Sequence, residues 1–149
     1  MKILIAVDGS GHAWKALELA IDIAKVRGGE LLCLHVTRAE PVLPGVRALA
    51  QAEGLPPEEE AARLREARQL GDELTREAER RARAAGLPSV RSFGAEGSPP
   101  AEILALAKDE GVDMIVMGSR GRKALAGGFL RSISRKVASH APCTCVLVR

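Results

Sequence analysis

Aromatic side chains are scarce in this chain, whose 149 residues include one Trp, two Phe and no Tyr. The core must therefore be built from Leu, Ile, Val and Ala. Proteins that bind single-stranded nucleic acid stack bases on aromatic rings, so this scarcity argues against a nucleic-acid partner. Asn is also absent, and Gln occurs only twice. That depletion is typical of heat-adapted proteins, although GC-rich codon usage has the same effect.

Long hydrophobic runs are lacking as well. No apolar segment approaches the roughly 20 residues that a membrane-spanning helix needs. The first apolar run, residues 3–7, is ended by Asp8 and is too short for a signal peptide. We therefore expect a cytoplasmic protein with no membrane partner, whose three cysteines are reduced thiols.

Negative charge is missing from the C-terminal quarter. Residues 114–149 contain seven Lys or Arg and no Asp or Glu, whereas the other 113 residues carry 15 basic and 19 acidic side chains. The overall net charge of +3 thus conceals a C-terminal segment of +7. Such a concentration of positive charge predicts an anionic ligand.

Short apolar runs alternate with amphipathic segments along the whole chain. Strands are predicted at residues 2–7, 31–36, 89–95, 113–117 and 143–148. Helices are predicted after Ser10, over residues 58–85, after Ser98 and over residues 129–140. This alternation predicts an α/β fold: one doubly wound, three-layer domain over residues 1–149 with a five-stranded parallel sheet. Right-handed crossovers with one change of direction predict the strand order 3-2-1-4-5.

Local signals predict how the helices begin, end and pack. Ser10 is expected to cap the first helix, and Gly28 and Gly86 to end the first and second. The long second helix is expected to bury an apolar stripe of Leu64, Ala67, Leu70, Leu74, Ala78, Ala82 and Ala85. His35 lies in an apolar strand and is interpreted as packed rather than catalytic.

A glycine loop follows the fourth predicted strand. Gly118 and Gly121 come directly after that strand and are followed by a basic segment. A strand that leads through a glycine turn into a helix is an arrangement that cradles phosphates. Ligands of doubly wound sheets bind where the strand order reverses, which here lies between the first and fourth strands, beside Asp8. Taken alone, Asp8 could equally cap a helix, and the glycines could be ordinary turn residues.

Six segments, in their order and spacing, resemble the universal stress protein family over nearly the whole chain. They are ILIAVDGS at residues 3–10, LCLHV at 32–36, GSPPAEI at 97–103, DMIVMGSRG at 113–121, SISRKV at 132–137 and HAPC at 140–143. The ATP-binding branch of that family carries the motif G-x2-G-x9-G-[S/T]. Gly118, Gly121 and Ser132 match it, but Arg131 replaces the third glycine. An arginine there either fills the pocket or offers a charged fork to phosphate oxygens.

The resemblance implies an adenine nucleotide as ligand: ATP, or AMP or another adenine nucleotide, with or without Mg²⁺. It implies that Val36 meets the base through its backbone, that Asp8 lies near base and ribose, and that the glycine loop and residues 131–134 surround ribose and phosphates. The implied cofactor-binding residues are Ala6, Asp8, Val36, Met117, Gly118, Arg120, Gly121, Arg131, Ser132, Ile133 and Ser134.

We do not predict an enzyme. The chain has no GxxxxGK[ST] loop, and its C-terminal loop carries no carboxylate to hold Mg²⁺ for phosphoryl transfer. The alternatives are a weak ATPase and a family member that acts only through protein contacts, for which Arg131 is the argument. His140, Cys143 and Cys145 are too few for a structural zinc site, so no metal site is predicted.

The fifth predicted strand, residues 143–148, is apolar and expected at an edge of the sheet. Edges of this kind invite pairing with another chain. The resemblance implies antiparallel pairing with a twofold-related copy, so we predict a homodimer through this strand.

Overall fold

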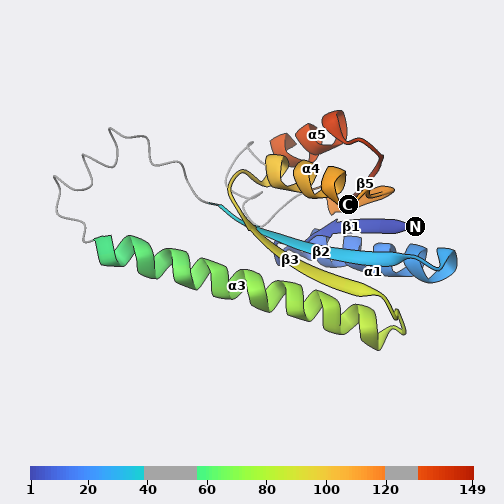
Figure 1. Cartoon of the computed structure of the whole chain (residues 1–149), viewed down its shortest axis with the longest axis horizontal. Coiled ribbons are helices and arrows are strands. Elements are labelled where there is room, and N and C mark those ends of the chain that lie inside the picture. Colours follow the sequence, from blue (N-terminus) through green and yellow to red (C-terminus); the bar gives the residue numbers. More distant parts are fainter. Residues whose placement is uncertain (39–56, 120–130) are drawn as a thin grey trace.

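The computed structural model describes residues 1–38, 57–119 and 131–149 of the chain. Its elements, labelled in Figure 1, are β1 (Lys2–Ala6), α1 (Gly11–Arg27), β2 (Glu30–Thr37), α3 (Pro57–Ala84), β3 (Val90–Glu96), α4 (Pro99–Asp109), β4 (Met114–Gly118), α5 (Arg131–His140) and β5 (Thr144–Val148). The predicted alternation of strands and helices is therefore confirmed in the described parts. The predicted start of the last helix, residues 129 and 130, lies outside them.

The sheet has five strands, all parallel, in the predicted order β3-β2-β1-β4-β5. β1 is central and pairs with both β2 and β4, so the strand order reverses on either side of it. The predicted fold class, a doubly wound α/β sheet, is thereby confirmed. Its carboxyl edge beside β1 is where such sheets bind ligands.

Helices cover both faces of the sheet, and this explains why the central strands are apolar at nearly every position. α1 and α3 lie on one face, and α4 and α5 lie on the other (Figure 1). The first face buries residues such as Leu17, Ala78 and Val116 in one apolar cluster, and the second buries residues such as Leu34, Ile103 and Val137 in another. Among the described helices, none combines the length and apolar composition needed to cross a membrane.

The predicted helix caps are present. Ser10 has an extended backbone, and its hydroxyl oxygen accepts a hydrogen bond from the Ala13 N–H at 3.1 Å. Gly28 and Gly86 follow α1 and α3 with φ of 62° and 87°, in the left-handed region that favours glycine. Ser98 occupies the N-cap position of α4, but its side chain makes no capping hydrogen bond.

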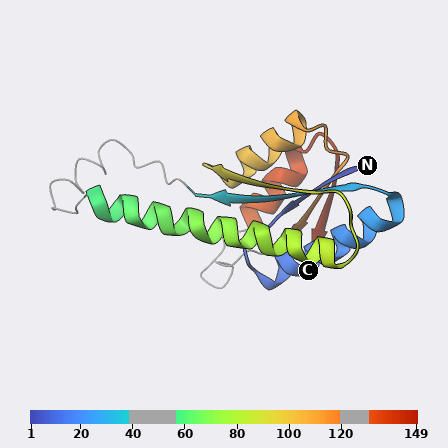
Figure 2. The ribbon, with the colours of Figure 1, turned by 60° about the horizontal axis from the view of Figure 1, so that its bottom comes forward.

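The predicted apolar stripe of α3 was partly wrong. Leu70 is 41% exposed, and Ala85 lies beyond the helix end. The buried positions of this helix include Gly71, Thr75, Ala78 and Ala82, all small residues. The first turns of α3 project beyond the sheet (Figure 2), so they have no sheet to pack against, and close contact begins near Gly71.

Candidate functional site

Four of the predicted site residues meet in one apolar cluster on the α4–α5 face. Ala6, the last residue of β1, is the register partner of Met117 in β4. Val36 comes from the end of β2, and Ile133 from the start of α5. All four pack in the same cluster, yet Ala6, Val36 and Ile133 stay partly exposed while Met117 is buried. A partly open apolar surface at this edge can receive the face of a small planar ring.

The backbone of Val36 faces the turn that follows β1. The Val7 N–H donates to the Leu34 carbonyl at 2.8 Å, so the peptide groups of Leu34 point towards β1. Residues two apart in a strand point the same way, and therefore those of Val36 do too. The register of β1 with β2 ends at the pair Ala6–Leu34. Val36 thus presents its N–H and C=O to the Asp8 turn.

The turn from β1 into α1 has a well-defined geometry. The half-buried Asp8 carboxylate accepts a hydrogen bond from the Ser10 N–H at 2.9 Å. Gly9 has φ of 79°, a backbone conformation that favours glycine. Ser10 then caps α1. Both readings of Asp8 remain physically compatible, because a carboxylate offers about four lone-pair positions and can bond the turn and a ligand together.

Gly118 has a structural reason to be glycine that sequence reasoning missed. A Cβ added to it would lie 2.9 Å from the Ala13 nitrogen and 2.9 Å from His12 atoms. The end of β4 therefore packs directly on the first turn of α1. The glycine loop begins immediately afterwards at Ser119, whose N–H donates to the Val148 carbonyl at 2.8 Å.

The phosphate half of the predicted site is only partly described. Arg120 and Gly121 lie outside the described residues, as do the side chains of Arg131 and Ser132. Helix α5 begins at Arg131, the position of the third motif glycine. Ser134 is buried with 6% exposure, and Ile133 is half-buried. Ile133 packs in the same cluster as Ala6 and Met117, so the first turn of α5 lies close to these residues.

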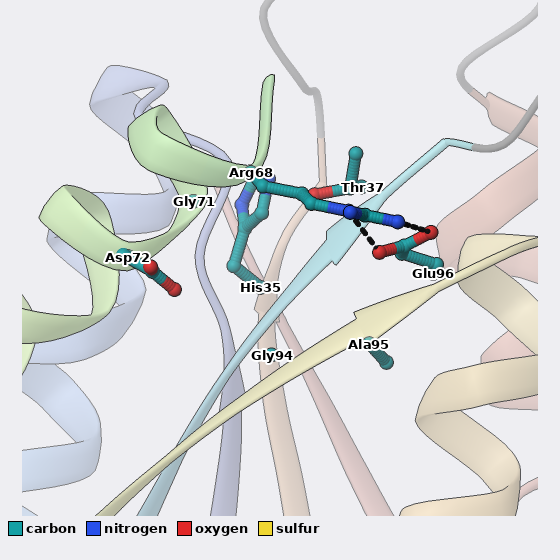
Figure 3. A pocket seen from close by; sticks show the side chains of 8 residues that line it. All are labelled: His35, Thr37, Arg68, Gly71, Asp72, Gly94, Ala95 and Glu96. Carbon is teal, nitrogen blue, oxygen red and sulfur yellow. Dashed lines mark hydrogen bonds and ion pairs between the residues drawn. The ribbon is translucent and has the colours of Figure 1, made fainter. Parts of the chain in front are cut away.

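A separate pocket of about 350 Å³ lies on the opposite face of the sheet, between α3 and the ends of β2 and β3. Figure 3 shows its lining: His35, Thr37, Arg68, Gly71, Asp72, Gly94, Ala95 and Glu96. Arg68 reaches from α3 to β3 and forms an ion pair with Glu96. Of the predicted site residues that the structure describes, none contributes to this lining. The two surfaces are separated by β2, whose successive side chains point to opposite faces.

His35 has a specific contact that the sequence prediction did not anticipate. Its ring nitrogen Nδ1 lies 2.8 Å from the carbonyl oxygen of Val7, the residue that follows β1. Strand alternation already places His35 on the same face as Cys33, towards α3. The sequence holds a second indication of this contact, because Gly71 is a glycine within a helix made mostly of good helix formers. A Cβ at Gly71 would lie 2.5 Å from the His35 ring.

The three thiols are not activated. Burial, with a smaller effect from the negative charge of Glu79, raises the pKa of Cys33 to about 12. Burial also raises the pKa of Cys143 and of Cys145. A nucleophilic cysteine needs a lowered pKa, so neither the buried Cys33 nor the partly exposed Cys143 and Cys145 is an activated nucleophile.

The parallel sheet, its strand order and the turn at the reversal point define a doubly wound α/β protein with a candidate ligand site at the carboxyl edge of the strands. A family model described as the universal stress protein family matches residues 1–149. The chain belongs to that family. It is 35% identical over 153 residues to the universal stress protein YxiE of Bacillus subtilis, covering 99% of this chain and 98% of that protein. It is 38% identical over 150 residues to a universal stress protein of Thermus aquaticus, covering 99% and 97%.

Solved structures have the same fold. UspA from Lactobacillus plantarum superposes with a TM-score of 0.77 at 23% identity, covering 100% of this chain and 97% of that one. A universal stress protein in complex with cAMP superposes with a TM-score of 0.68 at 19% identity, covering 100% and 97%. One from Archaeoglobus fulgidus in complex with dAMP superposes with a TM-score of 0.65 at 20% identity, covering 100% and 98%. At these identities the likeness establishes the fold.

Proposed function

We propose that this universal stress protein is a regulatory module that binds an adenine nucleotide, with ATP as the first candidate. The observation that carries the proposal is the meeting of Ala6, Val36, Met117 and Ile133 in one partly open apolar cluster beside the Asp8 turn. Two proteins of the same fold are complexes with cAMP and with dAMP, which supports an adenine nucleotide as the class of ligand.

The base and ribose would use residues of three strand ends. The apolar cluster offers a surface for the face of adenine, and the Val36 N–H and C=O can pair with its polar edge. Asp8 can accept a hydrogen bond from a ribose hydroxyl while it keeps the Ser10 N–H. This division of roles agrees with what the family resemblance implies for the same residues.

The phosphates would lie towards α5 and the glycine loop. A helix N-terminus attracts anions, and α5 begins at Arg131, within the segment that carries seven basic and no acidic residues. Bound Mg²⁺ would offset phosphate charge there. The main-chain amides of residues 117–121 and 131–134 are the donors that this proposal assigns to the phosphate oxygens.

A regulatory role is favoured over catalysis. Phosphoryl transfer needs a positioned nucleophile and carboxylates that hold Mg²⁺. The thiols are kept protonated by burial, and Asp8 is the one acidic side chain of the described residues that we assign to the site. Hydrolysis of ATP is accordingly expected to be slow or absent. We place this protein in the cytoplasm.

A homodimer through β5 is part of the proposal. Leu147 on this edge strand is 41% exposed. Leu147 lies on the same face of the sheet as Met117, its register partner in β4, whereas α1 covers the opposite face. The edge of β5 is therefore the surface that we assign to a second copy.

Calorimetric titration with ATP, with and without Mg²⁺, tests the ligand. We expect a dissociation constant in the micromolar range, roughly 8 kcal/mol of binding free energy. Asp8→Ala should weaken binding, whereas Asp22→Ala, at an exposed position of α1, should leave it unchanged. Nucleotide released on denaturing the purified protein would identify the natural ligand by mass. Flat titrations with ATP, AMP and cAMP would reject this function and favour a member that acts only through protein contacts.

A further inference from the structure

His35 bridges two strands at the point where β1 leaves the sheet. His35 lies two residues before the end of β2, and its Nδ1 is 2.8 Å from the Val7 carbonyl oxygen. A carbonyl oxygen can only accept, so Nδ1 carries the proton and donates it to this bond. Val7 directly precedes Asp8, and its own N–H donates to Leu34 at 2.8 Å. Both polar groups of the Val7 backbone are therefore held by β2.

Helix α3 sets the position of the imidazole ring. Gly71 is buried, and a Cβ there would lie 2.5 Å from His35 Cδ2 and 3.2 Å from Nε2. Glycine is a poor residue inside a helix, so its presence here reflects the need for clearance. Figure 3 shows the ring directed at this turn of α3. The same turn is supported by Thr75, whose hydroxyl lies 3.1 Å from the carbonyl oxygens of Gly71 and Asp72.

The Asp8 carboxylate belongs to the short turn that follows the contact between His35 and Val7. The Asp8 side chain bonds the Ser10 N–H, and the Ser10 hydroxyl bonds the Ala13 N–H. This fixes the turn to α1 at its far end. At its near end, β2 holds the Val7 backbone twice, through the bond of the Val7 N–H to Leu34 and through the His35 side chain at the Val7 carbonyl.

We propose that His35 is a positioning residue for the nucleotide site. Its Nδ1–H fixes the Val7 carbonyl and thereby the Asp8 carboxylate in the orientation that meets the ribose, and Gly71 of α3 holds the ring in place. This inference rests on the proposed function, since it assigns Asp8 to a bound nucleotide. It connects α3, on one face of the sheet, to a ligand site on the other.

Two variants of nearly equal shape separate the donor from the packing. In His35→Asn the amide nitrogen can take the place of Nδ1, whereas His35→Leu has similar bulk and no donor. The first readout is the hydrogen exchange rate of the Ser10 amide, followed by NMR without nucleotide. We expect His35→Leu to raise this rate on the order of tenfold, the factor equivalent to one hydrogen bond, and His35→Asn to restore most of the protection. The second readout is ATP affinity by calorimetry. We expect His35→Leu to lower this affinity more than His35→Asn does.

Cys33→Ala is the matched control, because Cys33 is fully buried on the same face of β2 but two residues from His35. It should lower global stability, but it should not raise the exchange rate of the Ser10 amide more than it raises the rates of the β1 amides. Should it raise Ser10 exchange as much as His35→Leu, the effect is general loosening and the proposal is wrong. Unchanged Ser10 exchange in His35→Leu likewise overturns it.

The two proposals can fail separately. If the wild-type protein binds no ATP, AMP or cAMP, the proposed function fails, while the exchange comparison still decides whether His35 holds the turn. If ATP binds and His35→Leu binds it as tightly as wild type, the positioning role alone is rejected. Should His35→Leu not fold, Gly71→Ala displaces the ring without removing the donor, and it is expected to raise Ser10 exchange and weaken ATP binding; no change in either would reject the positioning role.

Discussion

Gly118 of β4 and Ala13 of α1 are in such close contact that no side chain fits between them. A Cβ on Gly118 would lie 2.9 Å from the Ala13 nitrogen, a distance that forces one of the two elements to move. The glycine that opens the candidate phosphate loop is thus also a packing requirement at the strand reversal point. A substitution at this position tests the fold before it tests the ligand.

We expect Gly118→Ala to lower the free energy of unfolding by about 1–3 kcal/mol, the usual cost of overpacking. Gly11→Ala is the matched control, because a Cβ on Gly11 would meet nothing within 4 Å. That variant should be neutral or stabilising by up to about 1 kcal/mol. Urea denaturation of both proteins gives the comparison, and equal stabilities would contradict the contact.

The two serine caps should differ in their effect. Ser10→Ala removes a hydrogen bond to the Ala13 N–H and is expected to cost about 1 kcal/mol of stability. Ser98 occupies the same position on α4 but makes no capping bond, so Ser98→Ala should cost less than about 0.5 kcal/mol. Thermal and urea unfolding measure both, and a larger loss for Ser98→Ala would show that the caps are assigned wrongly.

Acid should lower the folding stability of the protein by protonating Glu77. Hydrogen bonds from Arg80 and then Arg81 lower the pKa of Glu77 from 4.5 to about 2 in the folded state. The unfolded chain therefore binds this proton more readily, so the contribution of Glu77 is complete above pH 4.5 and is lost as the pH falls towards 2. Glu77→Gln should make stability less dependent on pH in that window, while Glu73→Gln, an exposed acid of the same helix, serves as control. Urea unfolding across this range is the measurement, and equal slopes for wild type and Glu77→Gln would refute it.

Association through β5 can be tested with two equally exposed leucines. Leu147 on β5 and Leu70 on α3 are each 41% exposed. Leu147→Lys should convert the dimer to a monomer in sedimentation at micromolar concentration, because an edge lysine opposes strand pairing. Leu70→Lys should leave the dimer intact. A wild-type protein that sediments as a monomer would remove the dimer from the proposal.

Arg131→Gly distinguishes the two roles of the residue at the third motif glycine. If the guanidinium clamps phosphate, the change should weaken ATP binding by about 1.5–3 kcal/mol, the range for a hydrogen bond to a charged group. If the side chain fills the pocket, the same change should create or strengthen binding. Calorimetry with ATP reads the sign directly, and Arg135→Gly, at an exposed position of α5, controls for the lost charge. Unchanged affinity would assign Arg131 neither role.

Much of the fold could be predicted because its signals are local. The apolar strands, Ser10 before α1 and the left-handed glycines after α1 and α3 each depend on residues within a few positions. The strand order followed from general rules of chain connection. The alignment of Asp8 with the end of β4 followed from that order, and so did the edge positions of β3 and β5.

The buried face of α3 was harder to predict, because apolar periodicity does not show where a helix packs closely on a sheet through small residues. Leu70 was predicted to be buried but is exposed, whereas Leu74 packs on the core as predicted, and the buried positions beside it are Gly71, Thr75 and Ala78. Small residues are what a close contact needs, and they carry little hydrophobic signal. The same reasoning applies to Gly118, whose packing on α1 depends on two elements about a hundred residues apart.

By itself, then, the sequence determined the alternation of elements, the topology and the family, since each rests on short-range patterns repeated along the chain. The tertiary structure alone decided which backbone groups meet across strands, such as the Val7 carbonyl and the His35 ring. Such contacts depend on register and on the distance between layers. These are set by the packing of the whole core and are not encoded at any single position.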